Sequence, residues 1–202
     1  YSVNETDADK LGEVRDLLGD LQLAARGKKV HFIGAVVLVK MEDGTFLVVD
    51  GQQRLTTLSM IIAVLRDMET DPKLQALCHA LLGDSDRAFL GKSDAWRLTL
   101  NHIDNPYFRE AVQTEGATQR RDIETDESSN HNRMETNLRF IEKYLKSLSI
   151  EERRSLFETI RERVVLVRVS VPDWDGGYDV FRVLNTRGKA PNSHDIVKTE
   201  IL

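Results

Sequence analysis

Five consecutive residues, Asp50-Gly51-Gln52-Gln53-Arg54, separate two apolar segments and carry the residue types of an anion-binding site. The pattern predicts a strand before this run and a helix after it. The first backbone amides of a helix lack intrahelical partners and lie at the positive end of the helix dipole, so phosphate binds well there. Gly51 has no Cβ and allows close approach to the backbone. Arg54 lies in the first turn of the predicted helix and offers a forked cation to phosphate oxygens.

The other side chains of this corner have residue types that suit catalysis. Asp50 lies at the carboxyl end of the predicted strand, where a carboxylate can hold Mg²⁺ or act as a base. Gln52 and Gln53 can donate to an oxyanion or orient a water molecule, and Thr56 is a further candidate for phosphate binding. We therefore predict catalytic roles for Asp50, Gln52, Gln53 and Arg54.

A purely structural interpretation of the same run is also open. Asp-Gly is a common turn, Asp50 would then be a helix N-cap, and the two glutamines and Arg54 would form a solvated first turn. Two features favour a site. An arginine at the positive end of a helix is electrostatically unfavourable unless an anion compensates it. The five residues also form an unbroken non-apolar run between two apolar segments.

A second polar group occurs near the end of the chain. Asn185 and Arg187 precede Gly188, and Lys198 follows ten residues later. Asn185 and Gly188 suit the end of a helix, and Arg187 suits its negative pole. The alternative is a loop that offers Asn185, Arg187 and Lys198 to a polyanion, facing the same cleft as Arg54.

The elements that must position these residues follow from hydrophobic periodicity and breaker residues. A mobile surface loop is predicted for residues 114–129, a turn for residues 173–177, and a final helix that starts near Asn192 or Ser193 and continues past Ile201. The order of elements is typical of an α+β fold. Helices are predicted over residues 7–25, 52–69 and 130–148, with a short helix opened by Asp71-Pro72, another after the capping box Ser149-Ile150-Glu151-Glu152 and one around Tyr178 that ends at Gly188; strands are predicted over 30–39, 45–49, 95–100 and 164–171.

Composition excludes several classes of protein. The chain has 202 residues and a net charge of −5, which argues against a uniformly basic nucleic-acid binder. Cys78 is the one cysteine, which excludes an intrachain disulfide and a cysteine-rich zinc module. No apolar run reaches about 18 residues, so we expect no membrane span and a cytoplasmic location. Because the sequence starts at Tyr1 and stops inside a predicted helix, it is interpreted as a fragment of a longer protein.

Two segments together resemble a known family. The run from Asp50 to Leu58 resembles the DGQQR-L-T-T-L signature of the GmrS-like domain, which occurs in GmrSD-type modification-dependent restriction enzymes and in SspE-type phage-defence proteins. The stretch from Phe181 to Lys198 is similar to the later motif of that family. Phe32-Ile33-Gly34 and Arg97-Leu98 also fit.

The resemblance implies a ParB/sulfiredoxin-like core over residues 1–71 and 162–202, with a mostly helical insertion over residues 72–161. It implies that the corner receives the phosphates of a nucleoside triphosphate with Mg²⁺, held through the nucleotide and Asp50. Gly51, Gln52, Gln53, Arg54, Thr56, Asn185, Arg187 and Lys198 would then bind nucleotide. It also implies hydrolysis coupled to recognition of modified DNA, and cutting by a separate C-terminal HNH nuclease domain that this chain does not contain.

Other functions stay open from the sequence. The corner could bind a DNA phosphate or modified group without turnover, as a sensor of DNA modification, or the chain could be a scaffold. A homodimer is compatible with either function. The identity of the nucleotide base and of the DNA modification does not follow from these residues.

Overall fold

The structure is a computed structural model that describes residues 5–83, 96–120, 129–185 and 199–201. Its elements follow in this order: α1 (Glu5–Gly27), β1 (His31–Lys40), β2 (Phe46–Asp50), α2 (Gln52–Met68), α3 (Pro72–Leu82), β3 (Leu98–Thr99), α5 (Asn105–Phe108), the π-helical turn η1 (Arg109–Gln113), the 3-10 turn η2 (Ala117–Gln119), α6 (Ser129–Lys146), α7 (Ile150–Glu162), β4 (Val164–Val171), α8 (Trp174–Asn185) and β5 (Thr199–Ile201).

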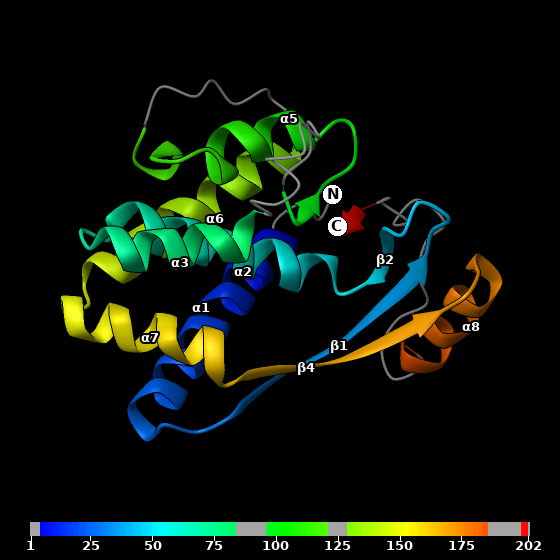
Figure 1. Cartoon of the computed structure of the whole chain (residues 1–202), viewed down its shortest axis with the longest axis horizontal. Coiled ribbons are helices and arrows are strands. Elements are labelled where there is room, and N and C mark those ends of the chain that lie inside the picture. The colour runs from blue at the N-terminus through cyan, green and yellow to red at the C-terminus, as the bar shows by residue number, and fades with distance from the viewer. Residues whose placement is uncertain (1–4, 84–95, 121–128, 186–198, 202) are drawn as a thin grey trace.

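Within these residues, five strands form one mixed sheet in the order β3-β5-β2-β1-β4. β1 and β4 are parallel, whereas the other neighbouring strands are antiparallel. β2 pairs with β1 only from Val37 onward, but β4 accompanies β1 from His31 to Val39. The first half of β1 therefore runs beside β4 alone, as a ribbon that leads from the helices to the sheet (Figure 1).

The helices and the sheet form the α+β fold that the sequence predicts. Helices α1, α2, α3, α6 and α7 gather on one side of the molecule, and α8 lies against the sheet at the other end (Figure 1). One large apolar core joins the helices. Among its fully buried side chains are Leu18, Leu21, Ile61, Ile141, Leu145 and Leu156. Within the described residues, no helix is both long and apolar enough to cross a membrane.

Local sequence signals explain where several helices begin. Ser149 and Glu152 form the reciprocal capping box expected for α7, since each side chain bonds the other's backbone amide. Asp71 caps α3 by accepting a hydrogen bond from the Lys73 amide at 2.9 Å, and Pro72 occupies the first helical position. For both helices, the observed start therefore coincides with the start that these caps predict.

The predicted turn at residues 173–177 is wrong, because α8 already begins at Trp174. The Asp173 side chain accepts a hydrogen bond from the Gly176 amide at 2.8 Å. Gly177 allows the helix to lie close to the sheet, since a Cβ there would come within 2.9 Å of Val39 Cγ2. The glycine pair thus marks close packing of a helix on strands.

The predicted final helix is also wrong at its end. Thr199–Ile201 form β5, which pairs with β2 on one side and with β3 on the other. Thr199 lies opposite Val48 and Ile201 opposite Phe46. Two of the three residues are β-branched, which favours strand over helix, and the strand places this segment beside the one that leads to Asp50.

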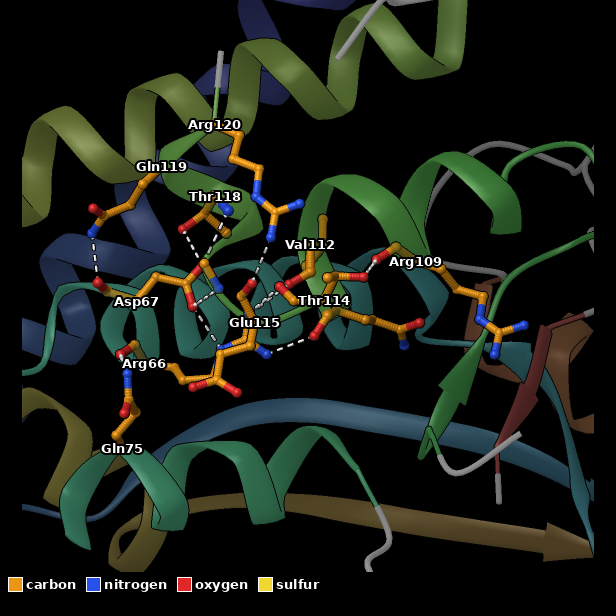
Figure 2. Close-up of polar contacts among 12 residues, drawn as sticks. Arg66, Asp67, Gln75, Arg109, Val112, Thr114, Glu115, Thr118, Gln119 and Arg120 are labelled. Atoms are coloured by element: carbon orange, nitrogen blue, oxygen red, sulfur yellow. Dashed lines mark hydrogen bonds and ion pairs between the residues drawn. The ribbon is translucent and has the colours of Figure 1, made fainter. Parts of the chain in front are cut away.

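The loop predicted for residues 114–129 is ordered in its first part. Ala117 is buried, and residues 117–119 form η2 against the end of α2. The reason lies in two neighbouring residues of α2, Arg66 and Asp67, whose side chains are fully buried and contact this segment (Figure 2). Residues 121–128 lie outside the described residues.

Arg66 and Asp67 bind opposite poles of two short helical turns (Figure 2). The Arg66 guanidinium donates to the carbonyl oxygens at the end of η1, those of Val112, Gln113 and Thr114, at 3.2, 2.6 and 2.7 Å. The Asp67 carboxylate accepts from the amides of Gly116 and Thr118, both at 3.0 Å, at the start of η2. A cation thus meets carbonyls and an anion meets amides, as backbone polarity favours at helix ends.

Candidate functional site: the corner between β2 and α2

The polar run forms the predicted corner. β2 ends at Asp50, α2 begins at Gln52, and Gly51 between them is the N-cap, with φ 95° and ψ 5°. Within the described residues, no side chain caps α2. The prediction of a strand that runs directly into a helix at Gly51 is confirmed.

Gly51 is required at this corner for two reasons. Its positive φ is a conformation that other residues adopt only with strain. A Cβ at Gly51 would also lie 2.9 Å from Val36 Cγ2 and 3.3 Å from the Ala35 carbonyl oxygen. The start of α2 therefore lies directly against the backbone of β1, which no side chain at this position would permit.

Arg54 is half-buried and is held by backbone. Its Nη1 donates to the carbonyl oxygen of Ala35 on β1 at 2.5 Å. Within the described residues, Arg54 makes no other hydrogen bond and no ion pair. A guanidinium has five N–H donors, so this single bond orients the cation without neutralising it.

Asp50 is half-buried and lies opposite Val37 in the β1–β2 pairing. The structure does not support its interpretation as the N-cap of α2, because Gly51 holds that position. In the part of the chain that the structure describes, the Asp50 carboxylate makes no hydrogen bond and no ion pair. Its oxygens are therefore not engaged in holding the corner together.

The remaining corner residues differ in their surroundings. Gln52 is half-buried, and its Nε2 donates to the carbonyl oxygen of Val48 at 2.8 Å, which ties the first turn of α2 to β2. Gln53 is exposed, and Thr56, one turn further on, is half-buried. Gln52 therefore has a structural contact at the corner, whereas Gln53 presents its side chain to solvent.

The donor set of the corner bears on how Mg²⁺ could be held. No group of three or more His, Cys, Asp or Glu side chains among the described residues could hold a metal ion. Mg²⁺ is commonly bound by one or two carboxylates together with substrate phosphates. A single carboxylate, that of Asp50, fits this pattern if the nucleotide supplies the other ligands.

The second polar group cannot be placed beside the corner. Asn185 is the last residue of α8. Arg187 and Lys198 lie outside the described residues, so the predicted convergence with Arg54 stays a prediction. The backbone of β5 does come near the corner, because Thr199 pairs with Val48, two residues before Asp50.

Two further contacts were not predicted from the sequence. The Arg54–Ala35 bond joins residues 19 positions apart, and the Arg66–Asp67 cluster lies in the last turn of the same helix that begins at Gly51. At this end, Arg154 of α7 hydrogen-bonds Glu69 and lowers the pKa of that carboxyl to about 2. A charged pair in the last turn of an apolar helix is the signal that could have indicated the cluster.

The comparisons with known proteins agree with the corner motif. The family model described as "GmrSD restriction endonuclease, N-terminal domain" matches residues 10–202. No curated protein and no solved structure matches the chain. Because the family match spans nearly the whole sequence, the chain belongs to the family of GmrSD restriction endonuclease N-terminal domains.

Proposed function

We propose that this domain binds and hydrolyses a nucleoside triphosphate and thereby regulates a modification-dependent restriction or phage-defence protein. The observation that carries the proposal is the state of Arg54. A half-buried arginine lies in the first turn of α2, bonded to one carbonyl oxygen and without a carboxylate partner among the described residues. A cation at the positive end of a helix favours an anionic ligand.

In this proposal the phosphates lie at the start of α2. The first-turn amides and the Arg54 guanidinium bind phosphate oxygens, and Gly51 lets the start of α2 pack against β1. Gln53 and Thr56 lie within the same first turns and add donors, while Gln52 keeps the turn attached to β2 through Val48. Asn185, Arg187 and Lys198 would complete the binding site from the C-terminal segment.

Hydrolysis then requires a water molecule aligned with the terminal phosphorus. A bond forms between the water oxygen and that phosphorus, and the bond from the phosphorus to the bridging oxygen breaks, so that the nucleoside diphosphate leaves with the electron pair. The proton of the water passes to a phosphate oxygen, and inorganic phosphate is released. Asp50 orients this water or holds Mg²⁺, which would neutralise charge on the phosphates. Catalysis is mainly positioning and charge stabilisation, as in other phosphoryl transfers.

The restriction family extends the proposal to partners. Modified DNA would be recognised with parts of the protein outside this chain, and cutting would fall to a C-terminal HNH nuclease domain in the cytoplasm. Nucleotide turnover would couple the two events. The acidic net charge of −5 favours nucleotide turnover over a simple DNA-binding role for this domain.

Arg54→Ala tests the proposal. We expect nucleotide affinity to fall about tenfold or more, because one charge-assisted phosphate bond contributes roughly 1.5–3 kcal/mol. A panel of nucleotides in a thermal-shift assay identifies the base that binds, since a ligand raises apparent stability. Affinity is then measured by calorimetry, and turnover is measured with and without modified DNA in the full-length protein.

Arg161→Ala is the matched control. It removes the same charge from the last turn of α7, where Arg161 pairs with its neighbour Glu162. Nucleotide binding should be unchanged in this variant. Equal affinities for wild type and Arg54→Ala would refute the role of Arg54, and binding of DNA without any nucleotide turnover would favour the sensor instead.

A further inference from the structure

Gly34 lies at an irregularity of β1 that faces the candidate site. Along the parallel pair, Phe32 is opposite Val165 and Ala35 is opposite Val167. Ile33 and Gly34 therefore both lie opposite Leu166, which makes a β-bulge with one extra residue on β1. Gly34 has φ 102°, a conformation that favours glycine. Bulges of this kind often redirect groups beside functional sites.

The group beside this bulge is the Arg54 side chain. A Cβ built on Gly34 would lie 3.2 Å from both Cζ and Nε of Arg54, and 3.5 Å from Nη1. The three nearest atoms to that Cβ all belong to the guanidinium. The next residue, Ala35, provides the carbonyl oxygen that accepts the Nη1 hydrogen bond. Gly34 thus leaves the space that the guanidinium uses while it bonds Ala35.

We propose that Gly34 is a positioning residue of the corner, which lets the Arg54 guanidinium lie against the bulge of β1 and bond the Ala35 carbonyl. Gly51 also lies close to this carbonyl, since an ideal Cβ on Gly51 would be 3.3 Å from the Ala35 oxygen. Two glycines with positive φ, Gly34 and Gly51, therefore lie beside the backbone that holds the cation. This role rests on the proposed function, because the anion that Arg54 meets is taken to be a nucleotide phosphate.

Gly34→Ala tests the role, and Gly44→Ala is its matched control. Gly44 also has a positive φ, 83°, but a Cβ there would meet nothing within 4 Å. Both variants therefore strain the backbone, and only Gly34→Ala contacts Arg54. We expect Gly34→Ala to weaken nucleotide binding about tenfold, toward the loss in Arg54→Ala, and Gly44→Ala to leave affinity within about twofold.

A double variant separates positioning from general damage. If Gly34 acts through Arg54, Gly34→Ala adds no further loss of affinity to Arg54→Ala. If Gly34→Ala alone unfolds while Gly44→Ala stays folded, the double variant should recover part of the lost stability, because the atoms nearest to the new Cβ are gone and only the strain of the positive φ remains. Three results would each overturn the role. The two single losses of affinity could multiply in the double variant, the double variant could be as unfolded as Gly34→Ala alone, or Gly34→Ala could bind nucleotide like Gly44→Ala.

A readout without nucleotide distinguishes this role from the proposed function. The Nε–H resonance of Arg54, identified by its loss in Arg54→Ala, reports how the guanidinium is held. It should shift in Gly34→Ala and stay in place in Gly44→Ala. If the shift occurs and no nucleotide binds to the wild type, the proposed function fails and the positioning role stands. If nucleotide binds and neither resonance nor affinity changes in Gly34→Ala, the positioning role fails alone.

Discussion

Asp50 and Asp71 show how two aspartates before helices differ in their roles. Asp71 accepts a hydrogen bond from the Lys73 amide and caps α3. Asp50 precedes α2, but the cap there is Gly51, and the described structure gives the Asp50 carboxylate no hydrogen bond. Variants of the two residues therefore allow a capping contribution to stability to be compared with the chemical role proposed for Asp50.

We predict that Asp50→Asn abolishes nucleotide turnover while the melting temperature stays within about 2 °C of wild type. Asn keeps the shape and removes the charge, so nucleotide binding is retained or becomes tighter as repulsion of phosphate is relieved. Turnover and affinity are measured on the same preparation. Asp71→Ala, by comparison, should cost about 0.5–2 kcal/mol, which lowers the melting temperature by roughly 2–4 °C per kcal/mol.

The opposite result would also be informative. If Asp50→Asn turned over nucleotide at the wild-type rate, Asp50 would have no catalytic role. If it melted as early as Asp71→Ala, the carboxylate would have a structural role that the described contacts do not contain.

At the scale of elements, α2 connects two polar ends. Its first turn forms the corner, and its last turn carries the buried pair Arg66 and Asp67, which binds η1 and η2 (Figure 2). The guanidinium satisfies three carbonyl groups that the end of a helical turn leaves without partners. The pair therefore attaches residues 109–120 to α2.

We predict that Arg66→Met destabilises the protein by about 3–5 kcal/mol, because it leaves a buried carboxylate and several buried carbonyls without their cation. Urea unfolding measures the loss. Arg154→Ala, which removes the partly exposed partner of Glu69, should cost about 1 kcal/mol or less. Equal losses in the two variants would contradict a special role for the buried pair.

At the scale of the whole molecule, the apolar core crosses the proposed boundary between residues 1–71 and 72–161. Leu18 and Leu21 of α1 and Ile61 of α2 share one core with Leu145 of α6 and Leu156 of α7. The division into a nucleotide-binding core and an insertion stays a prediction. Such shared burial favours unfolding as a single cooperative unit.

We predict that Leu145→Ala lowers the free energy of unfolding by about 2–5 kcal/mol, the usual cost of a cavity in a well-packed core. The same loss should be measured at both ends of the molecule. Trp96 packs against the helical core and Trp174 begins α8 beside the sheet. Variants that keep one tryptophan, made with Trp96→Phe or Trp174→Phe, report each end by fluorescence. Two separate unfolding transitions, of which Leu145→Ala shifts only the one reported by Trp96, would indicate independent units.

Sequence alone determined the local elements and the corner. Hydrophobic periodicity, Gly51 and the caps of α3 and α7 act between residues a few positions apart, so β1, β2, α2, β4 and the strand-to-helix corner were predicted close to their observed bounds. The specific DGQQR run also predicted the family. These features depend on backbone preferences that each short segment carries with it.

Tertiary structure decided which groups meet across long separations. The Arg54–Ala35 bond spans 19 positions, the contacts of Arg66 and Asp67 with η1 and η2 span 46 to 52, and β5 pairs with a strand about 150 residues earlier. Residues 114–120 read as a loop because their order comes from partners on α2, and residues 199–201 read as a helix because their strand partners are distant. Local sequence permits many such contacts. Packing selects among them, because each contact depends on where two separately formed elements lie in the folded molecule.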